Sequence, residues 1–226
     1  MKKKLGVITI GQSPRDDILT EMRPYIGNNV EIIQLGALDG LTYEEILVLE
    51  HEEDNNILIT KLRNGKTVNI AENLITSRIQ ECIYKLEEQE VDLILLMCTG
   101  VFPDVFISHK PILYPQKILH GVIPYLSGEG KIAIITPEKD QIEFYQKKWN
   151  ETGGDIFVLH GSPYGDMEEL DRVISALGKH ENVDLIVLDC MGYTQDMKLK
   201  IFERTNIPVI LAKTLIARLI GEMFSE

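Results

Sequence analysis

Residues 91–100 read VDLILLMCTG, and residues 183–192 read VDLIVLDCMG. Seven of the ten positions are identical, and a cysteine stands at the same place in both stretches, as Cys98 and Cys190. Each stretch is an apolar run without polar alternation, the pattern of a strand buried on both faces of a parallel sheet. Each cysteine therefore ends a predicted buried strand and precedes a turn that contains glycine.

The doubled stretch belongs to a longer internal repeat. Segments 4–9, 31–40 and 111–126 resemble, in the same order, segments 131–136, 156–165 and 208–224. Helical segments are predicted between the strands, at 14–26, 72–89, 138–152 and 166–181. This alternation predicts an α/β fold with two pseudo-symmetric parallel-sheet domains that face a central cleft.

The first copy carries an insertion. From Gly40 to Val91 there are 51 positions, whereas from Gly165 to Val183 there are 18, so the insertion has about 33 residues and lies at about 41–72. Its Thr42-x-x-Glu45 pattern predicts a capping box that opens a short helix. Residues 57–70, with Asn64-Gly65 at their centre, predict a β-hairpin that covers the first domain, mediates oligomer contact or acts as a lid.

Composition excludes several classes of partner. The net charge is −12 and the sequence pI is near 4.9, which argues against nucleic acids and anionic membrane surfaces. The apolar run after the N-terminal lysines is too short for a signal peptide, and no run reaches the length of a membrane span, so we expect a cytoplasmic protein. Three widely spaced cysteines do not suggest a disulfide framework, and no metal-binding motif is present.

Ligands of open parallel sheets bind beyond the carboxyl ends of the strands. After the first strand, Ser13 is predicted to cap a helix that begins at Pro14, with Asp16 completing a capping box. The N–H groups of such a helix end favour a carboxylate, which Arg15 would clamp with two hydrogen bonds. The alternative is a well-capped helix without a ligand, since Asp16 and Asp17 already complement the helix dipole.

Each repeat cysteine alone is readily explained as a small buried apolar residue. Two thiols at equivalent places, on opposite sides of one cleft, would instead suit the transfer of a proton from one face of a carbon to the other. A thiol pKa of about 8.5 falls at a helix N-terminus, so one sulfur can be a thiolate while the other stays protonated. The third thiol, Cys82, is predicted to pack in the core. The expected substrate-binding residues are Gln12, Ser13, Arg15, Thr99, Gly100, Thr136, Met191, Gly192, Tyr193 and Thr194.

At these residues the chain resembles the aspartate/glutamate/hydantoin racemase superfamily. The resemblance implies two pseudo-symmetric α/β domains, no cofactor, and a thiol–thiolate pair, Cys98 and Cys190, that removes and returns an α-proton. It also implies domains at 1–115 and 116–226, with a last helix at about 212–226 that packs back on the first domain.

More closely, the whole chain resembles the AroM family. The motifs that carry this resemblance are LGVITIGQSPRDD, DLILLMCTG, DLIVLDCMGYTQ and VILAKTLIARLIGE. AroM-type proteins are associated by name with aromatic biosynthesis. The chain departs from the amino-acid racemases, which usually carry an acidic or Asp-Ser pair after the first strand and Thr, often then His, after the second cysteine. Some AroM-like proteins have serine where Cys98 stands.

Three functions follow from these features. The first is a cofactor-independent racemase or isomerase that acts on a small carboxylate, with Cys98 and Cys190 as acid and base. The second is a chemistry that needs one thiol, either decarboxylation or cis–trans isomerisation, with Cys190 as the essential group. The third is a metabolite-binding regulator without turnover, linked to aromatic biosynthesis. The hairpin and the acidic surface are consistent with a homodimer.

Overall fold

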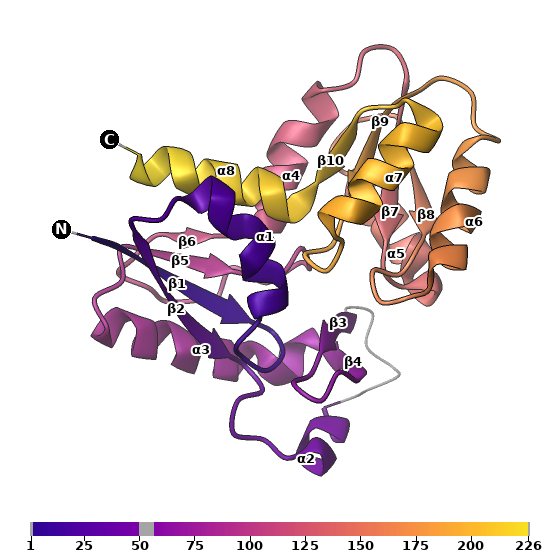
Figure 1. Cartoon of the computed structure of the whole chain (residues 1–226). Helices are drawn as coiled ribbons and strands as arrows, with labels where there is room; N and C mark the ends of the chain where they lie inside the picture. The colour runs from indigo at the N-terminus through magenta and orange to yellow at the C-terminus, as the bar shows by residue number, and fades with distance from the viewer. Residues whose placement is uncertain (1, 50–56, 226) are drawn as a thin grey trace. The chain divides into compact units, whose positions relative to one another are not determined.

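The computed structural model describes residues 2–49 and 57–225. The chain divides into two compact units (Figure 1). Unit 1 contains Met1–Gln116 and Arg218–Glu226, and unit 2 contains Lys117–Ala217. None of the helices in the described part of the chain is long and apolar enough to cross a membrane.

Unit 1 is built on a parallel four-stranded sheet with the order β2-β1-β5-β6. The buried parts of its central strands β1 and β5 are apolar except for Thr9, as expected for strands covered on both faces. Figure 1 shows α1 and α3 on opposite faces of this sheet. The bounds are β1 Lys3–Thr9, α1 Asp16–Ile26, β2 Val30–Gly36, α3 Glu72–Glu88, β5 Leu93–Leu96 and β6 Ile112–Leu113.

Unit 2 repeats this plan with the strand order β8-β7-β9-β10, again all parallel. Strands at the same place in the two sheets come from the matching segments of the repeat, so the predicted pseudo-symmetric pair of parallel sheets is confirmed. The bounds are α4 Pro115–Val122, η1 Ile123–Tyr125, β7 Lys131–Thr136, η2 Lys139–Gln141, α5 Ile142–Asn150, β8 Ile156–His160, α6 Met167–Leu177, β9 Val183–Leu188, α7 Gln195–Thr205, β10 Val209–Leu211 and α8 Ala212–Phe224.

The aspartate of the repeated VDL motif has the same structural task in both units. Asp92 accepts a hydrogen bond of 2.8 Å from the backbone N–H of Lys4, at the start of β1. Asp184 accepts one of 2.9 Å from the N–H of Gly130, just before β7. Each carboxylate therefore ties the beginning of one central strand to its neighbour, which accounts for this part of the repeat without any role in chemistry.

The insertion in unit 1 forms a short helix and a β-hairpin, as predicted. Helix α2 (Tyr43–Leu47) begins with the expected capping box of Thr42 and Glu45. Strands β3 (Ile57–Lys61) and β4 (Thr67–Ala71) are antiparallel and are joined by the turn that contains Asn64 and Gly65. The insertion shares one hydrophobic core with α3 and the sheet, through residues that include Ile46, Leu58, Leu62, Val68 and Ile70.

The two units differ in the connection that follows the cysteine. In unit 2 this connection contains α7, whereas in unit 1 residues 97–111 connect β5 to β6 without a helix. Helix α3 holds this irregular loop with two side chains. Gln80 pairs with both the N–H and the carbonyl of Ile107, and Glu87 accepts hydrogen bonds from Ser108 and from the N–H groups of His109 and Lys110.

The end of the chain returns to unit 1. Arg218 on α8 lies over the ring of Tyr25, 4.2 Å from the ring centroid. Residues 218–226 belong to unit 1, although α8 begins in unit 2.

Candidate functional site

The two repeat cysteines have matching local geometry. Each lies two residues beyond the end of a central strand, Cys98 after β5 and Cys190 after β9, and each is partly exposed. The sulfur of Cys98 accepts a hydrogen bond from the N–H of Gly100 at 3.3 Å, and the sulfur of Cys190 accepts one from the N–H of Gly192 at 3.4 Å. An N–H donor favours the thiolate over the thiol, so both turns can stabilise a negatively charged sulfur.

The turns that follow the two thiols lead into different structures. Thr99 and Met191 are buried, with 3% of their surfaces exposed. Thr194 is the N-cap of α7, where its hydroxyl accepts a hydrogen bond of 3.2 Å from the N–H of Met197. The turn after Cys190 thus leads directly into a helix N-terminus, and the turn after Cys98 does not.

The residues that precede the two thiols are chemically opposite. Met97 is apolar and 3% exposed, whereas Asp189 is charged and completely buried. Asp189 accepts a hydrogen bond of 2.8 Å from Nε1 of Trp149 and lies 3.4 Å from Nζ of Lys148, both on α5. Buried charges need such partners, so this contact ties the turn of Cys190 to α5.

His120 lies beside the buried contact between Asp189 and α5. Its ring lies 4.4 Å from that of Trp149. Burial lowers the pKa of His120 to about 4, and the nearby charge of Lys148 acts in the same direction, while Asp189 opposes it. His120 is therefore a neutral ring at neutral pH.

The loop after β1 corrects the prediction for Ser13. Helix α1 begins at Asp16 with Arg15 as its N-cap, and no side chain caps it. The Ser13 hydroxyl instead donates to Asp39 at 2.5 Å, and the Ser13 N–H donates to the same carboxylate at 2.9 Å. Asp39, which follows β2, was not singled out from the sequence; a polar side chain in a tight turn next to Gly40 was its only signal.

Arg15 does not form the exposed carboxylate clamp that the sequence predicted. Its guanidinium donates two hydrogen bonds of 2.8 Å to the carboxylate of Asp17, and its side chain is only 7% exposed. Burial raises the pKa of Asp17, but the contacts with Arg15 outweigh it and leave that pKa below its usual value. The bidentate geometry expected for a ligand is thus made within the chain.

A different arginine reaches this loop. Arg63, in the turn of the hairpin, donates from Nη2 to Asp39 at 2.7 Å and from Nε to the carbonyl of Ser13. Its backbone N–H donates to Oε1 of Gln12 at 3.2 Å. Arg63 therefore fastens the hairpin to the loop that contains the predicted binding residues Gln12 and Ser13.

In unit 2 the predicted residues Thr136 and Tyr193 are both buried. Thr136, at the end of β7, has no exposed surface, and its hydroxyl makes no hydrogen bond to any residue that the structure describes. The hydroxyl of Tyr193 donates to the carbonyl of Gly161, and burial raises its pKa well above the usual value. Two residues after Thr136, the pKa of Glu138 is raised by burial and by the neighbouring Asp140 and Glu169.

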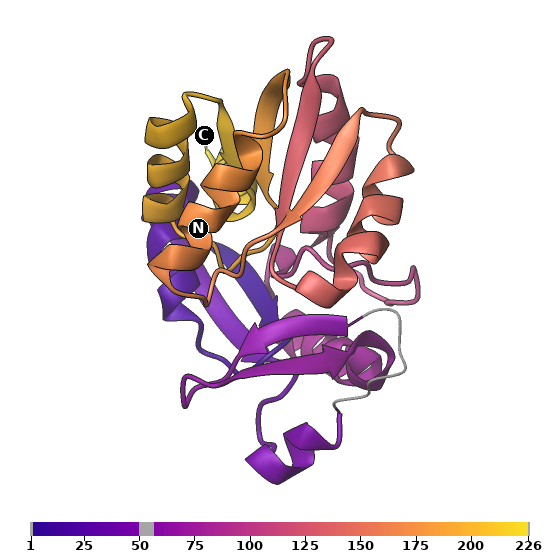
Figure 2. The same cartoon turned by 90° about the vertical axis from the view of Figure 1, so that its right-hand side faces the viewer.

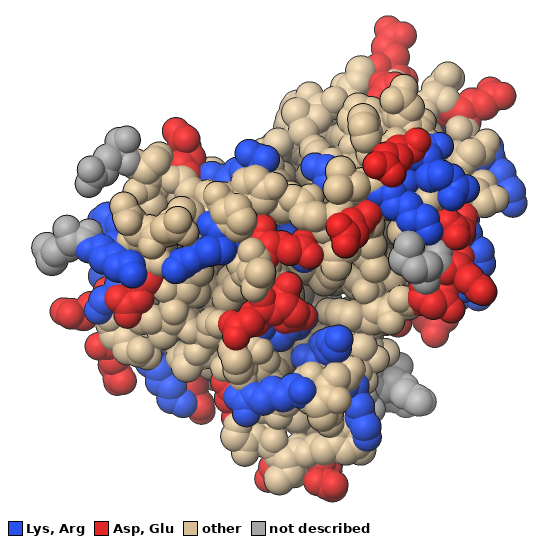
Figure 3. Space-filling model, viewed as in Figure 1, with Lys and Arg blue, Asp and Glu red and all other residues tan. Residues whose placement is uncertain are grey.

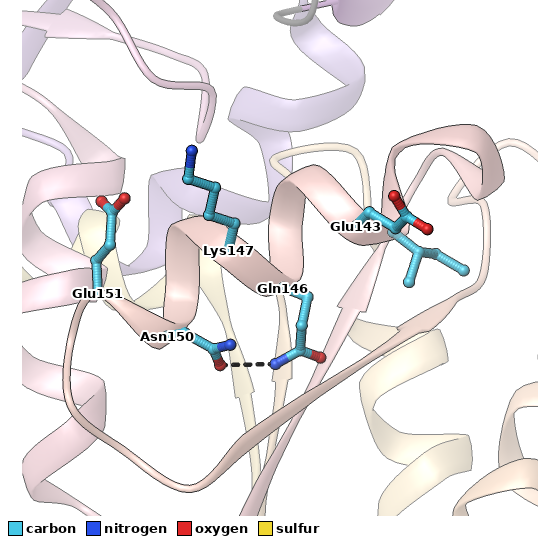
Figure 4. Close-up of a pocket in the computed structure, with 6 residues that line it drawn as sticks. Glu143, Gln146, Lys147, Asn150 and Glu151 are labelled. Carbon is cyan, nitrogen blue, oxygen red and sulfur yellow. Dashed lines mark hydrogen bonds between the residues drawn. The ribbon is translucent and has the colours of Figure 1, made fainter.

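A depression on α5 is separate from these residues. It has a volume of about 590 Å³ and is lined by residues 142, 143, 146, 147, 150 and 151 of α5 and its end (Figure 4). Gln146 and Asn150 are hydrogen-bonded to each other there, at 2.7 Å. The depression is thus an open strip along one helix that contains neither thiol.

On the face drawn in Figure 3, acidic and basic side chains are interspersed. Among residues 2–49 and 57–225, no group of three or more His, Cys, Asp or Glu side chains is arranged to hold a metal ion.

A family model described as AroM protein matches residues 5–224. The chain belongs to the AroM family. No curated protein matches this AroM chain in sequence.

Three solved structures similar to the AroM chain are an allantoin racemase from Klebsiella pneumoniae, an aspartate racemase from Picrophilus torridus and an unliganded arylmalonate decarboxylase. Their TM-scores are 0.65, 0.64 and 0.62, with sequence identities of 15%, 14% and 13%. The matches cover 98%, 98% and 99% of this chain, and 87%, 94% and 95% of the other chains. At these identities the likeness establishes the fold alone, which this chain shares with the two racemases and the decarboxylase.

Proposed function

We propose that this AroM protein is a cofactor-independent racemase or isomerase that acts on a small carboxylate, with Cys98 and Cys190 as its acid and base. One observation carries the proposal. In each unit a partly exposed sulfur lies beyond the carboxyl end of an equivalent strand and accepts a hydrogen bond from the N–H of the glycine two residues later.

The proposed chemistry uses one thiolate and one thiol. The thiolate takes the proton from the carbon next to the substrate carboxylate, and the electron pair left on that carbon is delocalised onto the carboxylate oxygens. The thiol on the other face then gives its proton to the same carbon. The product has the inverted configuration, and the two sulfurs have exchanged protonation states. Backbone N–H groups at the two turns stabilise the negative charge that develops.

The comparisons support this proposal through the named activities of similar folds. Two of the three proteins named above are racemases, and none of the three chains is matched over less than 87% of its length. The third is an arylmalonate decarboxylase, which places carboxylate chemistry of another kind on the same fold.

The test is a kinetic comparison of cysteine variants on a panel of enantiopure amino acids and 2-substituted carboxylates, with the loss of optical rotation as the readout. Cys98→Ser and Cys190→Ser should each slow the reaction by at least about 10³-fold, because a serine hydroxyl is a far weaker acid and base than a thiol. Cys82→Ser is the matched control and should keep the wild-type rate. Equal rates in all three variants would refute the two-thiol assignment.

A second candidate is a reaction that needs only Cys190. The asymmetry of the two turns favours it, because Cys190 follows the buried Asp189 and leads into the N-terminus of α7, while Cys98 follows Met97 and leads into an irregular loop. In a decarboxylase, Cys190 would give a proton to the carbon from which carbon dioxide leaves. This candidate predicts that Cys190→Ser is inactive and Cys98→Ser is active on an arylmalonate or a cis-dicarboxylate.

A further inference from the structure

The β3–β4 hairpin lies across the carboxyl edge of the unit 1 sheet, as Figure 2 shows. Its contacts follow the order of the strands beneath it. Leu58 packs against Gly100 after β5, Thr60 packs against Gly11 after β1, and Arg63 bonds to Ser13 and Asp39, which follow β1 and β2. The inserted hairpin therefore contacts the loops that follow three of the four strands of this sheet, β1, β2 and β5.

Leu58 is next to the thiol. A methyl group on Gly100 would collide with the Cδ2 atom of Leu58 and would lie 3.3 Å from the sulfur of Cys98. The leucine side chain and the sulfur thus flank the same glycine. Leu58 is 3% exposed, so it forms an apolar wall beside the Cys98 turn.

Thr60 is the polar exception on the inner face of the hairpin. Side chains alternate across a strand, so Leu58 and Thr60 point to the same side, where Val68 and Ile70 of β4 are also buried. Thr60 is 1% exposed, and its hydroxyl makes no hydrogen bond to any residue in the described part of the chain. A buried hydroxyl without a partner destabilises the fold, and a valine of the same shape would avoid this loss.

The neighbour of this hydroxyl is a glycine with no room for a side chain. A methyl group on Gly11 would collide with Oγ1 of Thr60, so the threonine oxygen lies directly against the backbone of the loop after β1. Gly11 is followed by the predicted binding residues Gln12 and Ser13. The hydroxyl that lacks a partner therefore lies at the carboxyl edge of the sheet, where ligands of open parallel sheets bind.

We infer that the hairpin supplies part of the substrate site, with Thr60 donating a hydrogen bond to the carboxylate of the ligand and Leu58 limiting the group that fits beside Cys98. This inference deepens the proposed function and rests on it, since Cys98 is taken as the thiol that meets the substrate. Arg63 is the positioning residue that fastens the hairpin to the loop.

The probe is the pair of thiol reagents iodoacetate and iodoacetamide. In both, the cysteine sulfur forms a bond to the CH₂ carbon, iodide leaves, and the thiol proton goes to solvent. Only iodoacetate carries a carboxylate. The ratio of the two rates at Cys98, followed by peptide mass spectrometry and divided by the same ratio for glutathione, therefore measures carboxylate binding next to this thiol without any turnover.

Thr60→Val is the decisive variant. In this variant the ratio of the iodoacetate rate to the iodoacetamide rate at Cys98 should fall by about tenfold. This is the effect expected from the loss of one hydrogen bond to a charged group. The thermal midpoint of the variant should equal or exceed that of the wild type, because an unpaired hydroxyl has been removed from the interior. Thr67→Val, the same change at an exposed position of β4, should alter neither quantity, and the ratio at Cys190 should stay constant.

Two results would overturn the inference. One is a Thr60→Val chain whose ratio at Cys98 equals that of the wild type. The other is a Thr60→Val chain whose thermal midpoint drops by several degrees, which would assign the hydroxyl to the fold. Because no reading depends on catalysis, loss of the proposed racemase activity and loss of this subsite remain separate outcomes.

Discussion

The sulfur atoms of Cys98 and Cys190 differ from that of Cys82 in their surroundings. The first two are partly exposed, and each accepts a hydrogen bond from a backbone N–H group. Cys82 lies inside α3 and is buried, as the sequence predicted. Burial is the largest influence on the pKa of Cys82 and raises it to about 11.

This contrast predicts selective alkylation. At pH 8 a thiol of pKa about 11 is ionised in about one molecule in a thousand, so Cys82 should react with iodoacetamide at least about tenfold more slowly than Cys98 or Cys190. Peptide mass spectrometry after brief labelling measures the three rates. In urea the labelling rates of all three cysteines should become alike. Labelling of folded Cys82 as fast as that of Cys98 would contradict the assignment of this thiol to the core.

Lys148 is the second residue that deserves a test, because it is 6% exposed and lies beside the fully buried Asp189. Removing one partner of a buried ion pair leaves the other charge uncompensated, so Lys148→Met should destabilise unit 2 by about 3 kcal/mol. The chain has a single tryptophan, Trp149, which bonds to Asp189. Denaturant unfolding followed by its fluorescence therefore reports on this group. Lys147→Met, at an exposed site, is the control, and equal stability of the two variants would refute the pairing.

At the scale of elements, the two connections after the cysteines show how one repeat acquired two structures. The unit 2 connection forms α7, capped by Thr194, whereas residues 97–111 of unit 1 are held by Gln80 and Glu87 of α3. Hydrogen bonds from Ser108 are the largest influence on the pKa of Glu87 and, with those from His109 and Lys110, lower it to about 2 against burial. The ionised form of Glu87 is thus the form that holds the loop.

Stability should depend on pH accordingly. A carboxyl whose pKa is lower in the folded chain stabilises the fold above its unfolded pKa, near 4.5, and loses this contribution as the pH falls toward 2. Glu87→Gln should therefore destabilise the chain by about 1–2 kcal/mol at pH 7, and its difference from the wild type should shrink steadily below pH 4.5. Thermal unfolding across this range tests it, with the exposed Glu88→Gln as control. A difference that does not change with pH would contradict the role of the charge.

The elements were predictable from the sequence where local signals agreed with the packing. The apolar runs, the capping box at Thr42 and the Asn64-Gly65 turn all appear as expected. The predicted start of α1 was wrong. The Ser13 hydroxyl, which a capping box would have used, donates its hydrogen bond to Asp39, a residue remote in sequence. Helix α7 was not expected, since its polar sequence carries little apolar periodicity beyond the buried Ile201.

At the scale of the whole molecule, the repeat determines the architecture. Two copies of one strand order give two parallel sheets, and the same position in each copy carries a thiol turn. The thiols could therefore be found from the sequence as a pair. Thr60, Arg63 and Asp39 could not, because their importance arises from contacts of the inserted hairpin with distant loops, which no periodicity or motif encodes.

In the proposed reaction, two thiols act on opposite faces of one substrate carbon. Its most direct test is the reaction of an enantiopure substrate in deuterium oxide, followed by proton NMR during the first few per cent of conversion. The inverted product should carry deuterium at the reacting carbon, while the recovered substrate should keep its original proton. A product that retains the substrate's own proton, or an inversion that proceeds unchanged in both Cys98→Ser and Cys190→Ser, would contradict it.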